Sequence, residues 1–128
     1  TVSKELVWNI MADRYLNKSV DLTTNGETNI YTVPTSQLAN PPIPPTVTII
    51  KSLLICNDSA GNETIDFKIS DKSLGPADIS LFKTKAINAT TTTELLTHPL
   101  VLEEGDVLKA TASTANTIHV ICSLVEIS

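Results

Sequence analysis

Residues 46–56 read TVTIIKSLLIC, and their apolar side chains fall on both alternating faces for much of the run. A strand with one solvated face alternates apolar and polar residues, whereas a strand covered on both faces is apolar throughout. This run therefore predicts a central strand of the core, with both of its faces covered.

Other segments of the chain alternate like half-buried strands. Residues 64–70 (TIDFKIS) give the cleanest case, since Ile, Phe and Ile share one face while Asp and Lys share the other. Asn25-Gly26 and the run EEGD at residues 103–106 are typical of turns between strands. The remaining strands are expected within residues 28–33, 79–83, 89–96, 99–102, 107–112 and 118–127.

The composition supports a fold made almost entirely of strands. Of the 128 residues, 40 are Ile, Val or Thr, whose β-branched side chains fit a pleated sheet better than a helix. A chain of this length suits a single domain. We predict an all-β fold, namely an antiparallel β-sandwich or jelly roll of about seven or eight strands.

The charge and the hydropathy pattern exclude some classes of partner. Nine Lys and Arg residues against 14 Asp and Glu give a net charge of −5, which is unsuited to binding a phosphate backbone, so we expect no nucleic-acid partner. The longest apolar runs, such as residues 53–56, are far shorter than the roughly 20 residues needed to cross a bilayer, so we expect no membrane partner.

The N-terminal segment, residues 3–16, is the only one with helical spacing. On a helix, one face would carry Leu6, Val7, Ile10, Met11 and Arg14. An extended arm fits the same residues equally well, because the segment is short and weakly capped. We place an N-terminal arm at residues 1–24 and the β-sandwich at residues 25–128. The arm could cover an open edge of the domain or reach a neighbouring subunit, where Trp8 and Tyr15 would be favoured anchors.

Residues 34–45 contain five prolines and predict an extended, polyproline-like strap. A rigid connector is the simpler interpretation. A recognition motif is the alternative, although no flanking Arg supports a ligand for an SH3 domain.

The sequence contains no recognisable catalytic or metal-binding pattern. Neither His98 nor His119 has the partners that a triad or a metal site needs, and both are interpreted as surface or strand histidines. The oxygen-rich residues 57–63 (NDSAGNE) fit no EF-hand spacing, so a plain turn is favoured over a Ca²⁺ site. The acidic residues within 103–106 are interpreted as a solvated turn. We therefore expect no enzymatic activity and no cofactor.

The chain has two cysteines, Cys56 and Cys122. Two buried free thiols are the favoured interpretation, and a bridge between neighbouring strands is the alternative.

Four stretches resemble small virion structural proteins of tailed bacteriophages. They are YTVP at residues 31–34, IIKSLLICN at residues 49–57, PLVLEEGDVLKA at residues 99–110 and the closing ASTANTIHV at residues 112–120. The resemblance extends from residue 31 to residue 127 and leaves the N-terminal arm unmatched. Residues 40–45 look like an insertion relative to the family.

The resemblance implies a non-enzymatic component of the virion. The expected role is a capsid decoration (cement) protein that binds the outer shell at the seams between capsomers and stabilises it. Its partners would be the major capsid protein or another virion protein, together with further copies of the chain in a trimer or dimer. The alternatives are a neck, tail or fibre-associated module, or a carbohydrate-binding sandwich that would use Trp8, Tyr15 and Tyr31 as exposed aromatics.

Two segments are expected to contact the shell, because neither is needed to complete the strand pattern. The contact residues would be Leu6, Trp8, Ile10, Met11 and Tyr15 in the arm and Pro41, Pro42, Ile43, Pro44 and Pro45 in the strap.

Overall fold

The alternating runs of the sequence form strands of two antiparallel sheets. The computed structural model describes residues 13–35 and 46–127. Within them the strands are β1 (Asp13–Leu22), β2 (Thr28–Thr32), β3 (Val47–Asn57), β4 (Glu63–Asp71), β5 (Ala77–Ile87), β6 (Thr92–Glu94), β7 (Leu100–Leu102), β8 (Val107–Ala112) and β9 (Ile118–Ile127). A single 3-10 turn, η1 (Lys72–Leu74), lies between β4 and β5. No helix in these residues has the length and apolar character that a membrane crossing requires.

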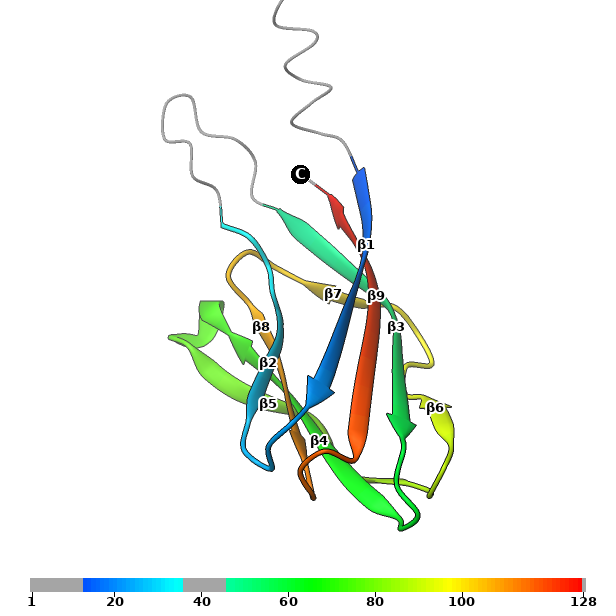
Figure 1. Cartoon of the computed structure of the whole chain (residues 1–128). Helices are drawn as coiled ribbons and strands as arrows, with labels where there is room; N and C mark the ends of the chain where they lie inside the picture. The colour runs from blue at the N-terminus through cyan, green and yellow to red at the C-terminus, as the bar shows by residue number, and fades with distance from the viewer. Residues whose placement is uncertain (1–12, 36–45, 128) are drawn as a thin grey trace, which may run out of the picture.

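The strand order is that of a jelly roll. The five-stranded sheet has the order β1-β9-β3-β6, with β7 also paired to β3, and the four-stranded sheet has the order β2-β8-β4-β5 (Figure 1). The chain repeatedly crosses from one sheet to the other, as it does in the two Greek keys of a jelly roll. The predicted all-β sandwich or jelly roll is confirmed.

The described residues contain nine strands rather than seven or eight. The extra strand arises because β6 and β7 share one position beside β3. β6 pairs with residues 54–56 of β3, and β7 pairs with residues 48–50. The two short strands therefore occupy the position of a single strand in an eight-stranded jelly roll.

The core lies between the two sheets and is filled mainly by aliphatic side chains, together with Tyr31 and Phe67. Ile50, Leu53 and Ile55 from β3 face Ile65 and Phe67 from β4, and all five are fully buried. β3 pairs with β9 on one side and with β6 and β7 on the other, so the prediction of a central strand is confirmed.

The prediction that both faces of residues 46–56 are covered is wrong for the described part of the chain. The inner face of β3 packs on the four-stranded sheet, but its outer residues Val47, Ile49 and Leu54 are only half-buried. The doubly apolar pattern therefore has a covering layer on one side only.

The structure also corrects the interpretation of residues 13–24. Residues 13–22, which the sequence placed with the arm, form β1, and β1 pairs along its whole length with β9 from Asp13↔Ile127 to Leu22↔Ile118. The helical alternative is therefore wrong for residues 13–16. Residues 1–12 and the proline strap at residues 36–45 lie outside the described residues.

Gly105 permits the turn between β7 and β8. Its φ of 83° lies in the left-handed region that glycine adopts without strain. The turn docks on the end of β2, because Gly105 N donates to Val33 O (3.1 Å) and Val33 N donates to Asp106 O (2.9 Å). A Cβ at this position would also run into the Lys72 side chain.

Gly105→Ala should lower the free energy of unfolding by about 1–2 kcal/mol, because alanine is strained at positive φ. The measurement is urea unfolding followed by circular dichroism. Gly61→Ala is the matched control, since Gly61 is exposed, has no positive φ and has no atom within 4 Å of an added Cβ. Equal losses for the two variants would contradict the role given to the Gly105 turn.

Candidate functional site

The outer face of the four-stranded sheet is charged. Lys68 and Lys109 are register partners on β4 and β8. Lys109 Nζ lies 3.4 Å from Glu27 Oε1 and 3.5 Å from Asp78 Oδ1, and Lys68 Nζ lies 4.0 Å from Glu27 Oε2. Such exposed, paired charges are well suited to contact with water.

The outer face of the five-stranded sheet carries exposed apolar side chains among its polar ones. Six large hydrophobic side chains among the described residues are exposed, and four of them lie on this face: Tyr15 (79%), Val101 (58%), Ile121 (39%) and Ile127 (37%). The other two lie singly, in η1 and β5. We call the outer surface formed by these four residues, with the half-buried Ile49 and the buried Val125 (5% exposed) between them, the apolar face.

The apolar face contains one row of side chains that crosses four strands. The register joins Tyr15 of β1 to Val125 of β9, Val125 to Ile49 of β3, and Ile49 to Val101 of β7. All four point away from the core, because their strand neighbours, such as Ile50 and Leu124, point into it. Cross-strand neighbours on one face lie about 4.5–5.5 Å apart, so the row is continuous.

The sequence located only one residue of the apolar face. Tyr15, a predicted contact residue, lies at the edge of the row. The other predicted contact residues, Leu6, Trp8, Ile10, Met11, Pro41, Pro42, Ile43, Pro44 and Pro45, lie outside the described residues. Val101, Ile121 and Ile127 were missed, although the doubly apolar run at residues 46–56 was a signal that an outer apolar face existed.

A buried polar cluster joins the two sheets close to the end of β9. The Tyr31 hydroxyl donates to Glu126 Oε2 (2.5 Å) and shares a hydrogen bond with Thr48 Oγ1 (2.7 Å). Arg14 Nη1 lies 3.9 Å from the other Glu126 oxygen. Burial, and then the hydrogen bond to Glu126, raise the pKa of Tyr31 well above its usual range, so its hydroxyl stays a donor. The cluster therefore holds a buried carboxylate between the sheets.

Tyr31→Phe should lower the free energy of unfolding by about 1–3 kcal/mol, because it leaves the Glu126 carboxylate buried without its hydroxyl donor. Urea unfolding at neutral pH measures the loss. Tyr15→Phe is the matched control, since the Tyr15 side chain is 79% exposed and should cost little. A Tyr31→Phe variant as stable as the control would show that the cluster does not hold the sheets together.

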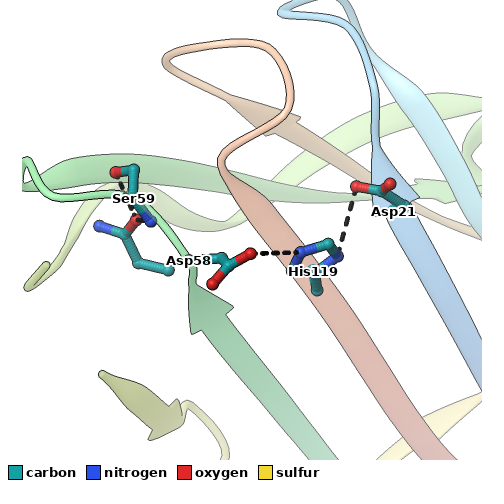
Figure 2. A network of polar contacts seen from close by, with 5 residues as sticks. Asp21, Asp58, Ser59 and His119 are labelled. Carbon is teal, nitrogen blue, oxygen red and sulfur yellow. Dashed lines mark hydrogen bonds and ion pairs between the residues drawn. The ribbon is translucent and has the colours of Figure 1, made fainter. Parts of the chain in front are cut away.

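A second polar cluster lies on the outside of the five-stranded sheet (Figure 2). His119 of β9 stands between Asp21 of β1, with Nδ1 to Oδ1 at 3.3 Å, and Asp58 after β3, with Nε2 to Oδ2 at 3.7 Å. The ion pairs exist only while the imidazole is protonated. All three side chains are exposed, so each pair contributes little to stability.

This cluster does not form a catalytic triad. Both ring nitrogens of His119 already face carboxylates, and the hydroxyl of the nearby Ser59 donates to Asn57 Oδ1 instead (2.8 Å). The Asn57 amide nitrogen donates to Gly61 O and Ile87 O, which orders the loop after β3. Within residues 13–35 and 46–127, no group of His, Cys, Asp and Glu side chains could hold a metal ion.

The two cysteines are free thiols on neighbouring strands, but of the two buried thiols that the sequence favoured only Cys122 is buried, and Cys56 is half-buried. They lie on opposite faces of the sheet: Cys122 is buried in the core, while Cys56 is the register partner of His119 on the outer face. Burial raises the pKa of Cys122 to about 12, which keeps that thiol protonated and unreactive.

The acidic turn is less solvated than the sequence suggested. Asp106 is only 6% exposed, because its carboxylate accepts from Lys72 N (3.1 Å) and Glu103 N (2.9 Å). Asp106 therefore anchors the β7–β8 turn and η1 to each other. A pocket of about 500 Å³ lies beside this turn and is lined mainly by residues 46–47, 72–73 and 103–106.

No protein-family model matches the sequence, and no curated protein matches it. The fold is similar to a structure of infectious bursal disease virus, Gx strain, with a TM-score of 0.53 and 8% identity over 90% of this chain and 32% of that chain. It is also similar to the VP2 subviral particle of the same virus, with a TM-score of 0.51 and 9% identity over 92% and 31%. A pentameric capsid protein from metagenomic phage sequences has a TM-score of 0.43 and 16% identity over 86% and 59%, which is too weak to support an argument.

The chain spans about a third of the length of these two viral chains. At these identities the likeness establishes a shared fold and nothing more. Jelly rolls occur in lectins and cupins as well as in capsids, so the fold alone does not decide the function.

Proposed function

We propose that this chain is a structural, non-enzymatic protein of a tailed-bacteriophage virion, a capsid decoration (cement) protein that binds the outer shell at the seams between capsomers. The observation that carries the proposal is the apolar face on one side of a jelly roll. The resemblance of residues 31–127 to small phage virion proteins, and the fold shared with a viral particle protein, support it.

The two outer faces suit a subunit of a larger assembly. Soluble monomers rarely expose contiguous apolar patches larger than a few hundred Å², and patches above that size mark interaction sites. On the opposite side, the paired charges of Glu27, Lys68, Asp78 and Lys109 favour water. This asymmetry supports a protein that turns one face to other subunits and the other to solvent.

Contact with the shell would come from the arm and the strap. The proposed contacts are Leu6, Trp8, Ile10 and Met11 of the arm, Tyr15 of β1 and residues 41–45 of the strap. Each copy would bind only the assembled shell and so stabilise it by mass action. A dimer or trimer would grip several shell subunits at once, and linked contacts add avidity to modest individual sites.

The carbohydrate-binding alternative loses one of its residues. Tyr31 is only 5% exposed and its hydroxyl is committed to Glu126 and Thr48, so it offers no ring to a sugar. Among the described residues, Tyr15 is the one exposed aromatic side chain.

Quantitative mass spectrometry of purified particles should find this chain in a copy number comparable with that of the major shell protein. That ratio is expected of a protein that occupies repeated seams across the shell. A handful of copies per particle would favour the neck, tail or fibre alternative instead. Complete absence from particles would contradict the virion proposal.

Deleting residues 1–12 should leave the fold intact and abolish attachment to particles, because the deletion spares β1 but removes four of the proposed arm contacts. Co-sedimentation with particles that lack the protein measures attachment, and circular dichroism measures folding. Ile79→Asp is the control, since Ile79 is exposed on the opposite sheet and should not change attachment. Full attachment of the deletion variant would exclude the arm as a shell contact.

A further inference from the structure

We infer that Asn25 is a site of spontaneous covalent modification, at which the Asn25-Gly26 turn converts its side-chain amide to a carboxylate with water as the co-reactant. The sequence marks Asn25-Gly26 as a turn between strands, and the virion proposal gives it no role. The inference goes beyond that proposal and does not rest on it, because the reaction needs neither a particle nor a partner protein.

The Asn25-Gly26 turn lies in an exposed link between the two sheets. Residues 23–27 are all exposed and join the end of β1 in the five-stranded sheet to the start of β2 in the four-stranded sheet (Figure 1). Neither Asn25 nor Gly26 belongs to a strand, so no strand ladder fixes their dihedral angles. The Gly26 amide donates to Thr24 Oγ1 (3.2 Å), a hydrogen bond at the surface that water can replace. Exposed links of this kind open at little cost in free energy.

The reaction joins two groups that are neighbours in the covalent chain. After the Gly26 amide loses its proton to water or hydroxide, its nitrogen attacks Asn25 Cγ. The N–Cγ bond forms, the Cγ–Nδ2 bond breaks, and the leaving group takes up a proton from water and departs as ammonia. Water then opens the cyclic imide. Attack at Cγ gives aspartate, and attack at the main-chain carbonyl carbon gives isoaspartate, in which the backbone runs through the side chain. In sum, one amide and one water become one carboxylic acid and one ammonia.

Glycine at position 26 makes this attack accessible. A side chain on the residue after an asparagine crowds the attacking nitrogen, whereas glycine leaves it open and lets the backbone rotate into the geometry of attack. Asn25 is the only asparagine of the sequence that precedes a glycine.

Other asparagines of the described residues are held by hydrogen bonds. The Asn57 amide nitrogen donates to two carbonyl oxygens (2.9 and 3.0 Å), and the next amide, Asp58 N, donates to a third (2.9 Å). Asn88 precedes Ala89, whose amide donates to Asn62 Oδ1 (2.9 Å). At both positions the nitrogen that would attack is already occupied in the folded chain. We therefore expect modification at Asn25 ahead of these sites.

The modification changes the surface charge of the molecule more than its fold. The new carboxylate makes the net charge one unit more negative than −5. It lies two residues from Glu27, whose carboxylate pairs with Lys109 (3.4 Å) and Lys68 (4.0 Å). These pairs are accessible to solvent and contribute little to stability, so the modified chain should stay folded. The product differs from the parent chain in its charge and, as isoaspartate, in the path of the link between the sheets.

Incubation of the full chain in mildly alkaline buffer at physiological temperature should produce aspartate and isoaspartate at position 25 and leave Asn57 unchanged. Peptide mapping by tandem mass spectrometry locates the products, and methylation by protein L-isoaspartate methyltransferase measures the isoaspartate. Circular dichroism confirms that the chain is folded throughout. The Asn25→Asp variant marks the position of the aspartate product in ion-exchange chromatography.

Gly26→Ala is the matched variant and should slow the conversion of Asn25 at least about tenfold. Alanine fits the turn, since Gly26 has no positive φ and an added Cβ would meet only Thr24 Oγ1, at 3.7 Å. Equal rates in the two chains would overturn the inference, because the reaction would not pass through the Gly26 nitrogen. A folded chain whose Asn25 stays intact while the urea-unfolded chain converts would overturn it too, since the turn would then protect the amide. None of these readouts involves particles, so failure here is distinguishable from failure of the virion proposal.

Discussion

The antiparallel pairing of β3 with β9 is the interaction on which the rest of the structure depends. It joins residues 47–57, in the middle of the sequence, to residues 118–127 near its end, and β1, β6 and β7 flank the pair. The same pairing orients two sets of side chains. One set, with Leu53, Ile55 and Val120, fills the core, and the other builds the row of the apolar face. Because a strand has a period of two, a slip of one residue would exchange the two sets, so the core and the outer surface share one register.

The sequence predicted the strands in which buried and exposed side chains alternate. β3, β4 and the β8–β9 hairpin were found because a buried inner face imposes a clear alternation. β1 was missed because it is an edge strand: its inward positions include Arg14 and Lys18, whose polar heads reach water at the open rim, and its outward positions include Tyr15. Such a strand does not show the alternation of apolar and polar residues that identifies a strand. A helical spacing therefore fitted residues 13–16 equally well.

The buried polar residues could not be predicted because their partners are distant in sequence. Tyr31 and Glu126 are 95 residues apart, and Asp106 accepts from an amide 34 residues away. Each residue is unremarkable in its local sequence, and an acidic turn such as residues 103–106 is normally solvated. Hydrogen bonds from residues distant in sequence allow these carboxylates to be buried, because a buried carboxylate is tolerated only where donors surround it. One cluster joins β2 to β9 through Tyr31 and Glu126, and the other joins η1 to the β7–β8 turn through Asp106.

The folded domain explains only the inner half of the apolar run at residues 46–56. Its inner residues need the four-stranded sheet, but nothing in the folded domain as described requires Val47, Ile49 and Leu54 to be apolar on the outer side. A solvated outer face would favour polar side chains there, as in β8, where Lys109 and Thr111 alternate with buried Leu108 and Ala110. The interpretation that residues 46–56 are covered on both faces thus fails for the described part of the chain. These outer apolar side chains extend the surface that our proposal turns toward other subunits.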